Sequence, residues 1–185
     1  MRAAIIISLC LLTGCLPDTD TYTIRKGSTW VRPYFKYRND SPILNINVRF
    51  DSTCIYPPQR VECEGDWSKL IYFGTLNPHH NGAAYVWRCV GADRHLEIGY
   101  YLWYNGEAPF TTGRMGVIQV VTPGEWYNLK IDLRNGVTWI VQGAIVHHFD
   151  LPITDWWITQ GWFSGEDNSG RDCPTGQQIT YTLQK

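Results

Sequence analysis

The stretches RHLEIGYYLWYNG (residues 94–106) and WYNLKIDLRNG (residues 126–136) decide the fold. Apolar and polar side chains alternate along each stretch, and each stretch ends in an Asn-Gly pair. Alternation with a period of two residues places successive side chains on opposite faces of a β-strand, and Asn-Gly favours a tight hairpin turn. The middle of the chain is therefore predicted to form an antiparallel sheet with one apolar face and one polar, aromatic face.

Further strands are expected along the rest of the chain. Pro33 interrupts the aromatic segment 30–37, which suits an edge strand or a loop. The other expected strands are 22–25, 44–50, 67–74, 83–90, 115–121, 144–149, 156–163 and 178–183. The pattern predicts an all-β, antiparallel two-sheet β-sandwich of about 10–12 strands with no substantial helix. The number and length of these strands resemble the concanavalin-like and laminin-G-like jelly rolls over most of residues 20–185.

The size and charge of the chain indicate one globular domain. The chain has 185 residues, of which 14% are aromatic and 18% are charged. Such a length and composition favour a single folded domain, predicted here over residues 21–185. Sixteen basic and seventeen acidic side chains give a net charge of -1. No nucleic-acid partner is expected, because those proteins carry a basic stripe or patch.

The start of the chain has the pattern of an export signal. One positive charge precedes about ten apolar residues, too few to span a bilayer, and Leu12-Thr13-Gly14-Cys15 follows. This tetrapeptide resembles the lipobox of bacterial lipoproteins, which implies a signal peptide over residues 1–14. It also implies that Cys15 is lipidated and that residues 15–20 form a short tether. The alternative is an ordinary signal peptide that is cleaved nearby.

A lipidated Cys15 would attach the protein to a membrane of the cell envelope. Leu16 rather than Asp follows this cysteine, which by the same resemblance implies the outer membrane if the host is Gram-negative. Cys10 leaves with the signal, so four cysteines remain. An even number in an exported protein indicates two disulfides, with three possible pairings. We favour Cys54–Cys63, which closes a short loop, and Cys89–Cys173, which joins a middle strand to a C-terminal loop.

The turn at Asn135-Gly136 determines which side chains are expected to share a face. If these residues form a two-residue turn, Asp132 lies opposite Trp139 and Ile131 lies opposite Ile140. The expected core side chains are then Leu129, Ile131, Leu133 and Ile140. The candidate ligand-binding residues are those of the other face, together with the polar side of the strand at 94–104: Glu97, Tyr101, Trp103, Trp126, Asn128, Lys130, Asp132 and Trp139.

Aromatic rings beside carboxylate, amide and ammonium groups suit a sugar, since its C–H faces stack on rings and its hydroxyls form hydrogen bonds. The leading prediction is a lipid-anchored, non-catalytic binding module that holds a glycan or an envelope protein. One alternative is a divergent carbohydrate-active enzyme, either a glycosidase or a lyase. Another is a purely structural or protein-interaction lipoprotein, in which the large aromatic side chains serve packing.

No catalytic residue, metal site or cofactor is assigned from the sequence. A glycosidase needs two carboxylates, and Glu97 with Asp132 would be the pair. The jelly-roll polysaccharide lyases use Arg, His and Tyr on one sheet face, and Arg94, His95 and Tyr101 supply these types without a recognisable motif. His147-His148 lie in an alternating strand, so their rings are expected on opposite faces and cannot hold one ion together.

Overall fold

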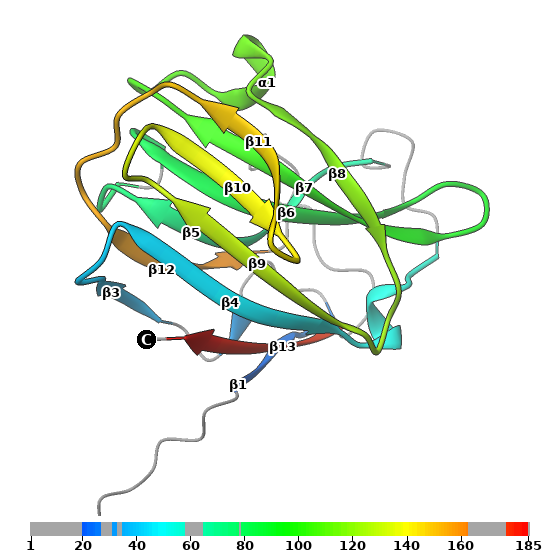
Figure 1. Ribbon diagram of the computed structural model, residues 1–185. Coiled ribbons are helices and arrows are strands. Elements are labelled where there is room, and N and C mark those ends of the chain that lie inside the picture. Colours follow the sequence, from blue (N-terminus) through cyan, green and yellow to red (C-terminus); the bar gives the residue numbers. More distant parts are fainter. Residues whose placement is uncertain are drawn as a thin grey trace, which may run out of the picture.

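Two antiparallel sheets packed face to face form the molecule (Figure 1). The computed structural model describes residues 20–26, 31–32, 35–57, 65–77, 79–162 and 177–184. In the order of their pairing, the strands of sheet A are β11 (Ala144–Phe149), β10 (Val137–Val141), β9 (Trp126–Asp132), β4 (Ile43–Phe50), β13 (Gln177–Gln184), β1 (Asp20–Ile24) and β2 (Val31–Arg32). Those of sheet B are β3 (Lys36–Arg38), β12 (Trp157–Trp162), β5 (Ser68–Gly74), β6 (Gly82–Val90), β7 (His95–Trp103) and β8 (Met115–Val121).

The prediction of an all-β antiparallel sandwich is confirmed. The described helical residues are the 3-10 turn η1 (Ser52–Cys54) and the four-residue helix α1 (Pro109–Thr112). The described residues form thirteen strands rather than about 10–12. The difference arises around Pro33, where the chain forms two short pieces, β2 at the edge of sheet A and β3 at the edge of sheet B. An edge position suits this segment because proline cannot donate a ladder hydrogen bond.

The two sheets differ in how their outer faces are covered, the outer face being the one that points away from the other sheet. In β4 and β9 of sheet A, buried residues alternate with partly exposed ones, so only the inner face is fully covered. All seven residues of β5 in sheet B are buried, as are the first six of β6. Sheet B is therefore covered on both faces at its centre.

The first Asn-Gly turn forms as predicted. Asn105 and Gly106 both have positive φ, 54° and 79°. They are the two residues between Tyr104 and Glu107, which form an antiparallel bridge. Positive φ at both central positions is what a two-residue type I′ turn requires, and Asn and Gly adopt it at little cost.

The second Asn-Gly turn differs from the prediction by one residue. Asp132 lies opposite Thr138, and Ile131 lies opposite Trp139. Only Gly136 of the Asn-Gly pair has positive φ, at 83°. A three-residue loop with glycine in the left-handed position explains this register, since it moves every later side chain to the other face.

Two predicted side-chain positions in β10 are therefore wrong. Trp139 is fully buried between the sheets, whereas Ile140 is only partly buried and shares the outer face of sheet A with Lys130. The other three predicted core residues, Leu129, Ile131 and Leu133, are buried as expected. The buried Trp139 indole donates a hydrogen bond to the Ala84 carbonyl at 3.1 Å. This bond joins β10 of sheet A to β6 of sheet B.

Two of the predicted disulfide cysteines lie in the described part of the chain. Cys54 and Cys89 are both buried and are not bonded to each other. The Cys54 thiol contacts the Gln178 carbonyl at 3.4 Å, and the Cys89 thiol contacts the Tyr56 carbonyl at 3.7 Å. Their predicted partners, Cys63 and Cys173, lie outside the described residues, as does Cys15, so the disulfides and the lipid anchor stay predictions.

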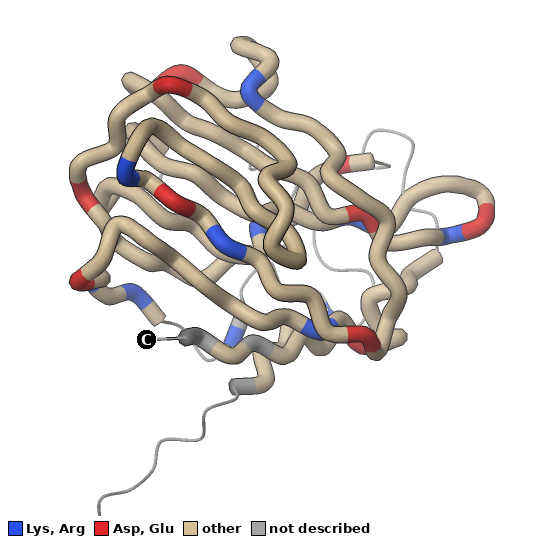
Figure 2. Tube along the Cα trace, in the orientation of Figure 1, with Lys and Arg blue, Asp and Glu red and all other residues tan. Residues whose placement is uncertain are grey.

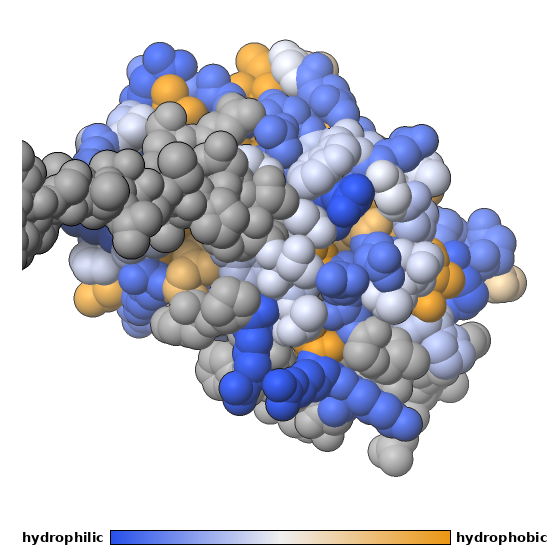
Figure 3. Space-filling view, turned by 90° about the horizontal axis from the view of Figure 1, so that it is seen from below, coloured by the Kyte–Doolittle hydropathy of each residue, from blue (hydrophilic) through white to orange (hydrophobic). Residues whose placement is uncertain are grey.

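The described surface is polar and carries both signs of charge. Lys and Arg are interspersed with Asp and Glu along the described chain (Figure 2). On the side seen in Figure 3, hydrophobic side chains are scattered among hydrophilic ones wherever the surface is described. Among the described residues, no helix has the length and apolar character needed to cross a bilayer.

Candidate functional site

The eight candidate residues of the sequence analysis do not form one surface. Glu97, Tyr101 and Trp103 lie along β7 in sheet B, and the last two belong to a buried cluster separate from the main core. The outer face of sheet A holds a second group: Trp126, Asn128, Lys130 and Asp132. Trp139 lies in the core between the sheets. The structure thus offers two distinct polar and aromatic faces on opposite sides of the sandwich.

Small residues in β6 form the floor of the outer face of sheet B. A side chain at Gly82 would meet the Tyr72 hydroxyl at 2.1 Å and the Tyr72 ring at 2.2 Å, so this ring lies directly against the backbone of β6. Gly99 of β7 is covered in the same way, since a side chain there would meet Trp67 at 2.7 Å. The aromatic cluster of this face consists of Trp67, Tyr72, Ala84, Val86, Tyr101 and Trp103.

Lys69 brings a cation into this aromatic cluster. Its residue is 3% exposed, and its Nζ lies 5.1 Å from the centre of the Tyr101 ring and 5.8 Å from that of Trp103. A cation over an aromatic face is attracted by the ring quadrupole, more strongly where water is excluded. Lys69 was not predicted as a site residue, because β5 departs from strict alternation.

A register irregularity in β5 accounts for the position of Lys69. The pairing with β6 shifts between Lys69 and Ile71. Leu70 and Ile71 consequently both belong to the core between the sheets, and the next outer residue is Tyr72. The adjacent apolar pair Leu70-Ile71 is the sequence signal of this bulge, since regular alternation would send one of them outward.

His79 lies at the exposed rim of the same face. Its ring stacks on Trp103, with centroids 5.7 Å apart and planes at 9°. Partial burial, with the nearby charge of Lys69 as a second cause, lowers the pKa of His79 from 6.5. The loop that carries His79 is fixed to sheet B, because the Tyr72 hydroxyl donates to the Asn81 carbonyl at 2.8 Å. His79 is therefore a positioned, neutral imidazole at neutral pH.

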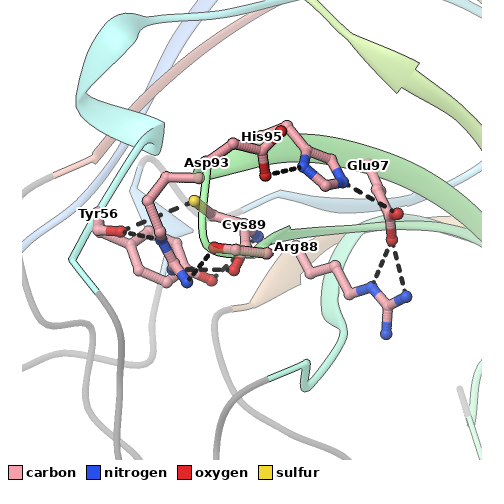
Figure 4. Close-up of polar contacts among 8 residues, drawn as sticks. Tyr56, Arg88, Cys89, Asp93, His95 and Glu97 are labelled. Carbon is pink, nitrogen blue, oxygen red and sulfur yellow. Dashed lines mark hydrogen bonds and ion pairs between the residues drawn. The ribbon is translucent and has the colours of Figure 1, made fainter.

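A chain of charged contacts lies at the other end of β7 (Figure 4). Arg88 donates through Nε to Glu97 at 2.7 Å and through Nη1 to the Gly65 carbonyl at 2.9 Å. Its guanidinium lies 4.1 Å from the centre of the Trp67 ring. Glu97 is thus engaged by Arg88, and the pair fixes Trp67 at the border of the aromatic cluster.

His95 extends this chain toward the turn between β6 and β7. Its Nδ1 lies 2.8 Å from the Asp93 carboxylate, and its Nε2 lies 3.3 Å from Glu97 (Figure 4). These hydrogen bonds, that to Asp93 first, raise the pKa of His95 above 6.5. The protonated imidazole can donate a hydrogen bond from each nitrogen, one to each carboxylate, whereas the neutral form has only one N–H to donate.

The outer face of sheet A is held by its own contacts. The Asn128 amide donates to both Asn45 and Asn47, at 2.9 Å each. The Arg49 guanidinium lies 5.1 Å from the centre of the Trp126 ring, which is on a residue 44% exposed. This face is held by hydrogen bonds, and among the described residues it carries no buried cation comparable to Lys69.

Neither catalytic set considered from the sequence is assembled. Glu97 and Asp132 lie on opposite outer faces of the sandwich and pair with Arg88 and Arg134 respectively. They cannot flank one glycosidic bond. Arg94 adopts positive φ, at 51°, and donates to the Tyr56 and Cys89 carbonyls at the β6–β7 turn, so it is removed from Tyr101.

The histidine pair of β11 divides between two environments, as predicted. The His147 ring stacks on Tyr100 with centroids 4.1 Å apart. His148 instead bonds Thr138 at 2.8 Å through Nδ1. The two rings therefore cannot bind one ion together.

Solved structures with a similar fold include several alginate lyases. A variant of alginate lyase Aly36B bound to an alginate tetrasaccharide has a TM-score of 0.56 at 15% identity, over 90% of this chain and 80% of that chain. The PL7 alginate lyase AlyA1 from Zobellia galactanivorans has a TM-score of 0.50 at 10% identity, over 81% of this chain and 64% of that one. The PL-14 alginate lyase from Aplysia kurodai has a TM-score of 0.50 at 13% identity, over 88% and 80%.

No protein-family model and no curated protein sequence matches the chain. At these identities the structural similarity establishes the jelly-roll fold. The leading prediction of a non-catalytic binding module is nevertheless wrong, because the similar structures are enzymes that act on a polysaccharide. The alternative of a carbohydrate-active jelly-roll enzyme is better supported.

Proposed function

We propose that the protein is a polysaccharide lyase that cleaves a polymer containing uronic acids on the outer face of sheet B. The observation that carries this proposal is the nearly fully buried Lys69 beside Tyr101 and Trp103. The carboxylate of a uronic acid suits such a site, since it would pair with the ammonium, and the exposed His79 ring stacked on Trp103 marks the side from which the polymer would approach. The fold shared with alginate lyases supports the same class of substrate.

Elimination from a uronate requires a base and a stabilised carboxylate rather than two acidic residues. A base removes the proton from C5, the C4–O bond to the departing sugar breaks, and a C4–C5 double bond forms. Negative charge develops on the carboxylate as the proton leaves, and a fixed cation stabilises it most where water is excluded. Lys69 is the cation in this proposal.

His79 is the proposed base. Its pKa is lowered by burial and then by Lys69, which keeps the imidazole neutral and able to accept the C5 proton. The imidazolium so formed can return this proton to the departing C4 oxygen. His79 is at the exposed rim, stacked on Trp103, so a polymer entering from solvent meets the base first.

Hydrolysis is less well supported by this geometry. A glycosidase needs one carboxyl group as acid and a second as base or nucleophile. Glu97 is held by Arg88 and His95, and Asp132 lies on the other side of the sandwich. The cation and imidazole of the outer face of sheet B suit elimination instead.

The products distinguish the two reactions. The purified protein is incubated with alginate, polygalacturonate and a glucuronate-containing polymer, and with neutral β-glucan as the control. We expect ultraviolet absorbance from the unsaturated product with at least one polyuronate, and fragments lighter than hydrolysis products by one water. Saturated fragments, or cleavage of the neutral glucan alone, would reject the lyase.

The lipobox-like sequence suggests where such an enzyme would act. We propose that residues 1–14 are removed and that Cys15 anchors the domain to a membrane of the cell envelope. Stable anchoring needs more than one acyl chain, which a fully acylated cysteine provides. Labelled palmitate should enter the wild-type protein and not Cys15→Ala. Equal labelling of both would reject the anchor.

A further inference from the structure

A pocket opens on the side of the molecule opposite the proposed catalytic face. It lies at one end of sheet A, with a volume of about 380 Å³. This is within the range of small-ligand sites, which are roughly 300–1,000 Å³. Its lining residues are Thr21, Arg49, Phe50, Asp51, Ser52, Pro123, Gly124, Gln178 and Thr180. Hydroxyl and amide groups with one arginine dominate this set, which was not predicted from the sequence.

The strand register aligns the polar groups of this pocket. Trp126 lies opposite Arg49, Arg49 opposite Thr180, and Thr180 opposite Thr21, across β9, β4, β13 and β1. Directly opposed residues share a face. An exposed aromatic ring, a guanidinium and two hydroxyl groups therefore form one straight row, with the pocket over its β4–β1 part.

The charged groups of the pocket differ in how far they are already engaged. The Asp51 carboxylate accepts from the Thr53 amide at 2.9 Å and caps η1. That bond, with other contacts including the charge of Arg49, lowers the pKa of Asp51 below 3.8. Arg49 forms no ion pair within the described part of the chain and stacks on Trp126. Its guanidinium donors are therefore available to a ligand anion.

The pocket walls are fixed by backbone hydrogen bonds. The Asp51 amide donates to the Gln178 carbonyl at 3.0 Å, and the Gly124 amide donates to the Phe50 carbonyl at 2.8 Å. The Gln178 amide donates to the Thr53 hydroxyl at 3.0 Å. A wall held in this way costs little ordering entropy when a ligand binds.

We propose that this pocket binds one carboxylated sugar residue of a polysaccharide, as an accessory site remote from the catalytic face. Arg49 would hold the carboxylate in a bidentate pair, since its planar fork matches that geometry. Thr21, Thr180 and Gln178 offer hydrogen bonds to the sugar hydroxyls. Trp126, in the same row, would stack on the neighbouring residue of the polymer.

Amide NMR on the full chain tests this site directly. The protein carries Lys69→Met so that any cleavage of the substrate is slowed, and the probes are tetramannuronate, neutral cellotetraose and inorganic phosphate. Tetramannuronate should shift the amide signals of Thr21, Gly124 and Thr180 and the Trp126 indole signal. Arg49→Ala should weaken this binding at least tenfold and Arg49→Lys several-fold, whereas Arg38→Ala, an exposed arginine of β3, should leave it unchanged.

Three results would overturn the assignment. They are no shift at these residues with tetramannuronate, equal binding of cellotetraose, and binding of phosphate as tight as that of the uronate. Because binding rather than turnover is measured, the accessory site and the lyase activity can be rejected independently of each other. Arg49-dependent binding in a protein without lyase activity would retain the accessory site and reject the lyase.

Discussion

Trp126 and Trp139 lie on neighbouring strands in opposite environments. Trp139 is fully buried between the sheets and bonds Ala84, while Trp126 is 44% exposed on the outer face of sheet A. The sequence alone does not reveal this difference, because a shift of one residue in the strand register exchanges the two faces of an alternating strand. The buried position of Trp139 is thus set by the loop that precedes β10.

Replacing each tryptophan by alanine measures the difference. Trp139→Ala removes a buried indole and leaves a cavity, and we expect a loss of about 3–5 kcal/mol in the free energy of unfolding. Trp126→Ala should cost about 1 kcal/mol or less, as for an exposed side chain. Denaturant unfolding of both variants provides the values. Equal losses would contradict the observed register.

The ionisation of His79 is a second property set at the residue scale. Burial and then the charge of Lys69 lower its pKa from 6.5. Lys69→Met removes the charge that opposes the imidazolium, so the pKa of His79 should rise. NMR titration of the imidazole signals measures this shift, with the adjacent His80 as the control. A wild-type His79 with a pKa at or above 6.5, or a His79 pKa that Lys69→Met does not change, would show that Lys69 does not act on the imidazole.

At the scale of elements, the strands could be predicted from alternation, whereas only one of the two Asn-Gly turns could. Asn105-Gly106 and Asn135-Gly136 are the same dipeptide, yet only the first forms a two-residue turn. The difference depends on where each flanking strand is held by its other neighbours, such as β4 beside β9. This pairing joins residues that are distant in sequence, so it cannot be inferred from the residues around the turn alone.

The candidate site could be predicted only where the strands alternate regularly. Tyr101 and Trp103 follow from regular alternation in β7, and they do line the proposed catalytic face. Lys69 could not be predicted, because the bulge in β5 interrupts the alternation from which the two faces of a strand are assigned. His79 was not among the candidate residues, since its stacking on Trp103 is a tertiary contact.

The loop before β10 makes a specific prediction about glycine. A side chain at Gly136 would meet the Phe149 carbonyl at 2.4 Å, and the residue has φ of 83°. Gly143 has nearly the same φ, 82°, with no atom within 4 Å, so it is the matched control. Both Gly→Ala variants bear the left-handed strain of about 1–2 kcal/mol. Gly136→Ala should lose a further 1–3 kcal/mol or so from the steric conflict.

Thermal or denaturant unfolding of these two glycine variants decides the point. Equal stability of Gly136→Ala and Gly143→Ala would show that the hairpin relaxes freely. The close approach of β11 to the β9–β10 loop would then not determine the register.

At the scale of the whole molecule, the sandwich presents two faces of different chemistry. The outer face of sheet B is covered and holds Lys69 among aromatic rings, which suits a reaction that develops charge away from water. The outer face of sheet A is open. It carries the hydrogen-bonded amide side chains of Asn45, Asn47 and Asn128 and the pocket that contains Arg49, and it suits ligand binding without catalysis. We assign catalysis to the first face and polymer retention to the second.

The same Lys→Met substitution on each of the two faces tests this assignment. The rate of formation of unsaturated product from a polyuronate is measured for the wild type, for Lys69→Met and for Lys130→Met. We expect a fall of about 10²-fold or more for Lys69→Met, as for loss of a group that stabilises developing charge, and little change for Lys130→Met on the outer face of sheet A. A Lys69→Met protein as active as the wild type, with both folded, would contradict it.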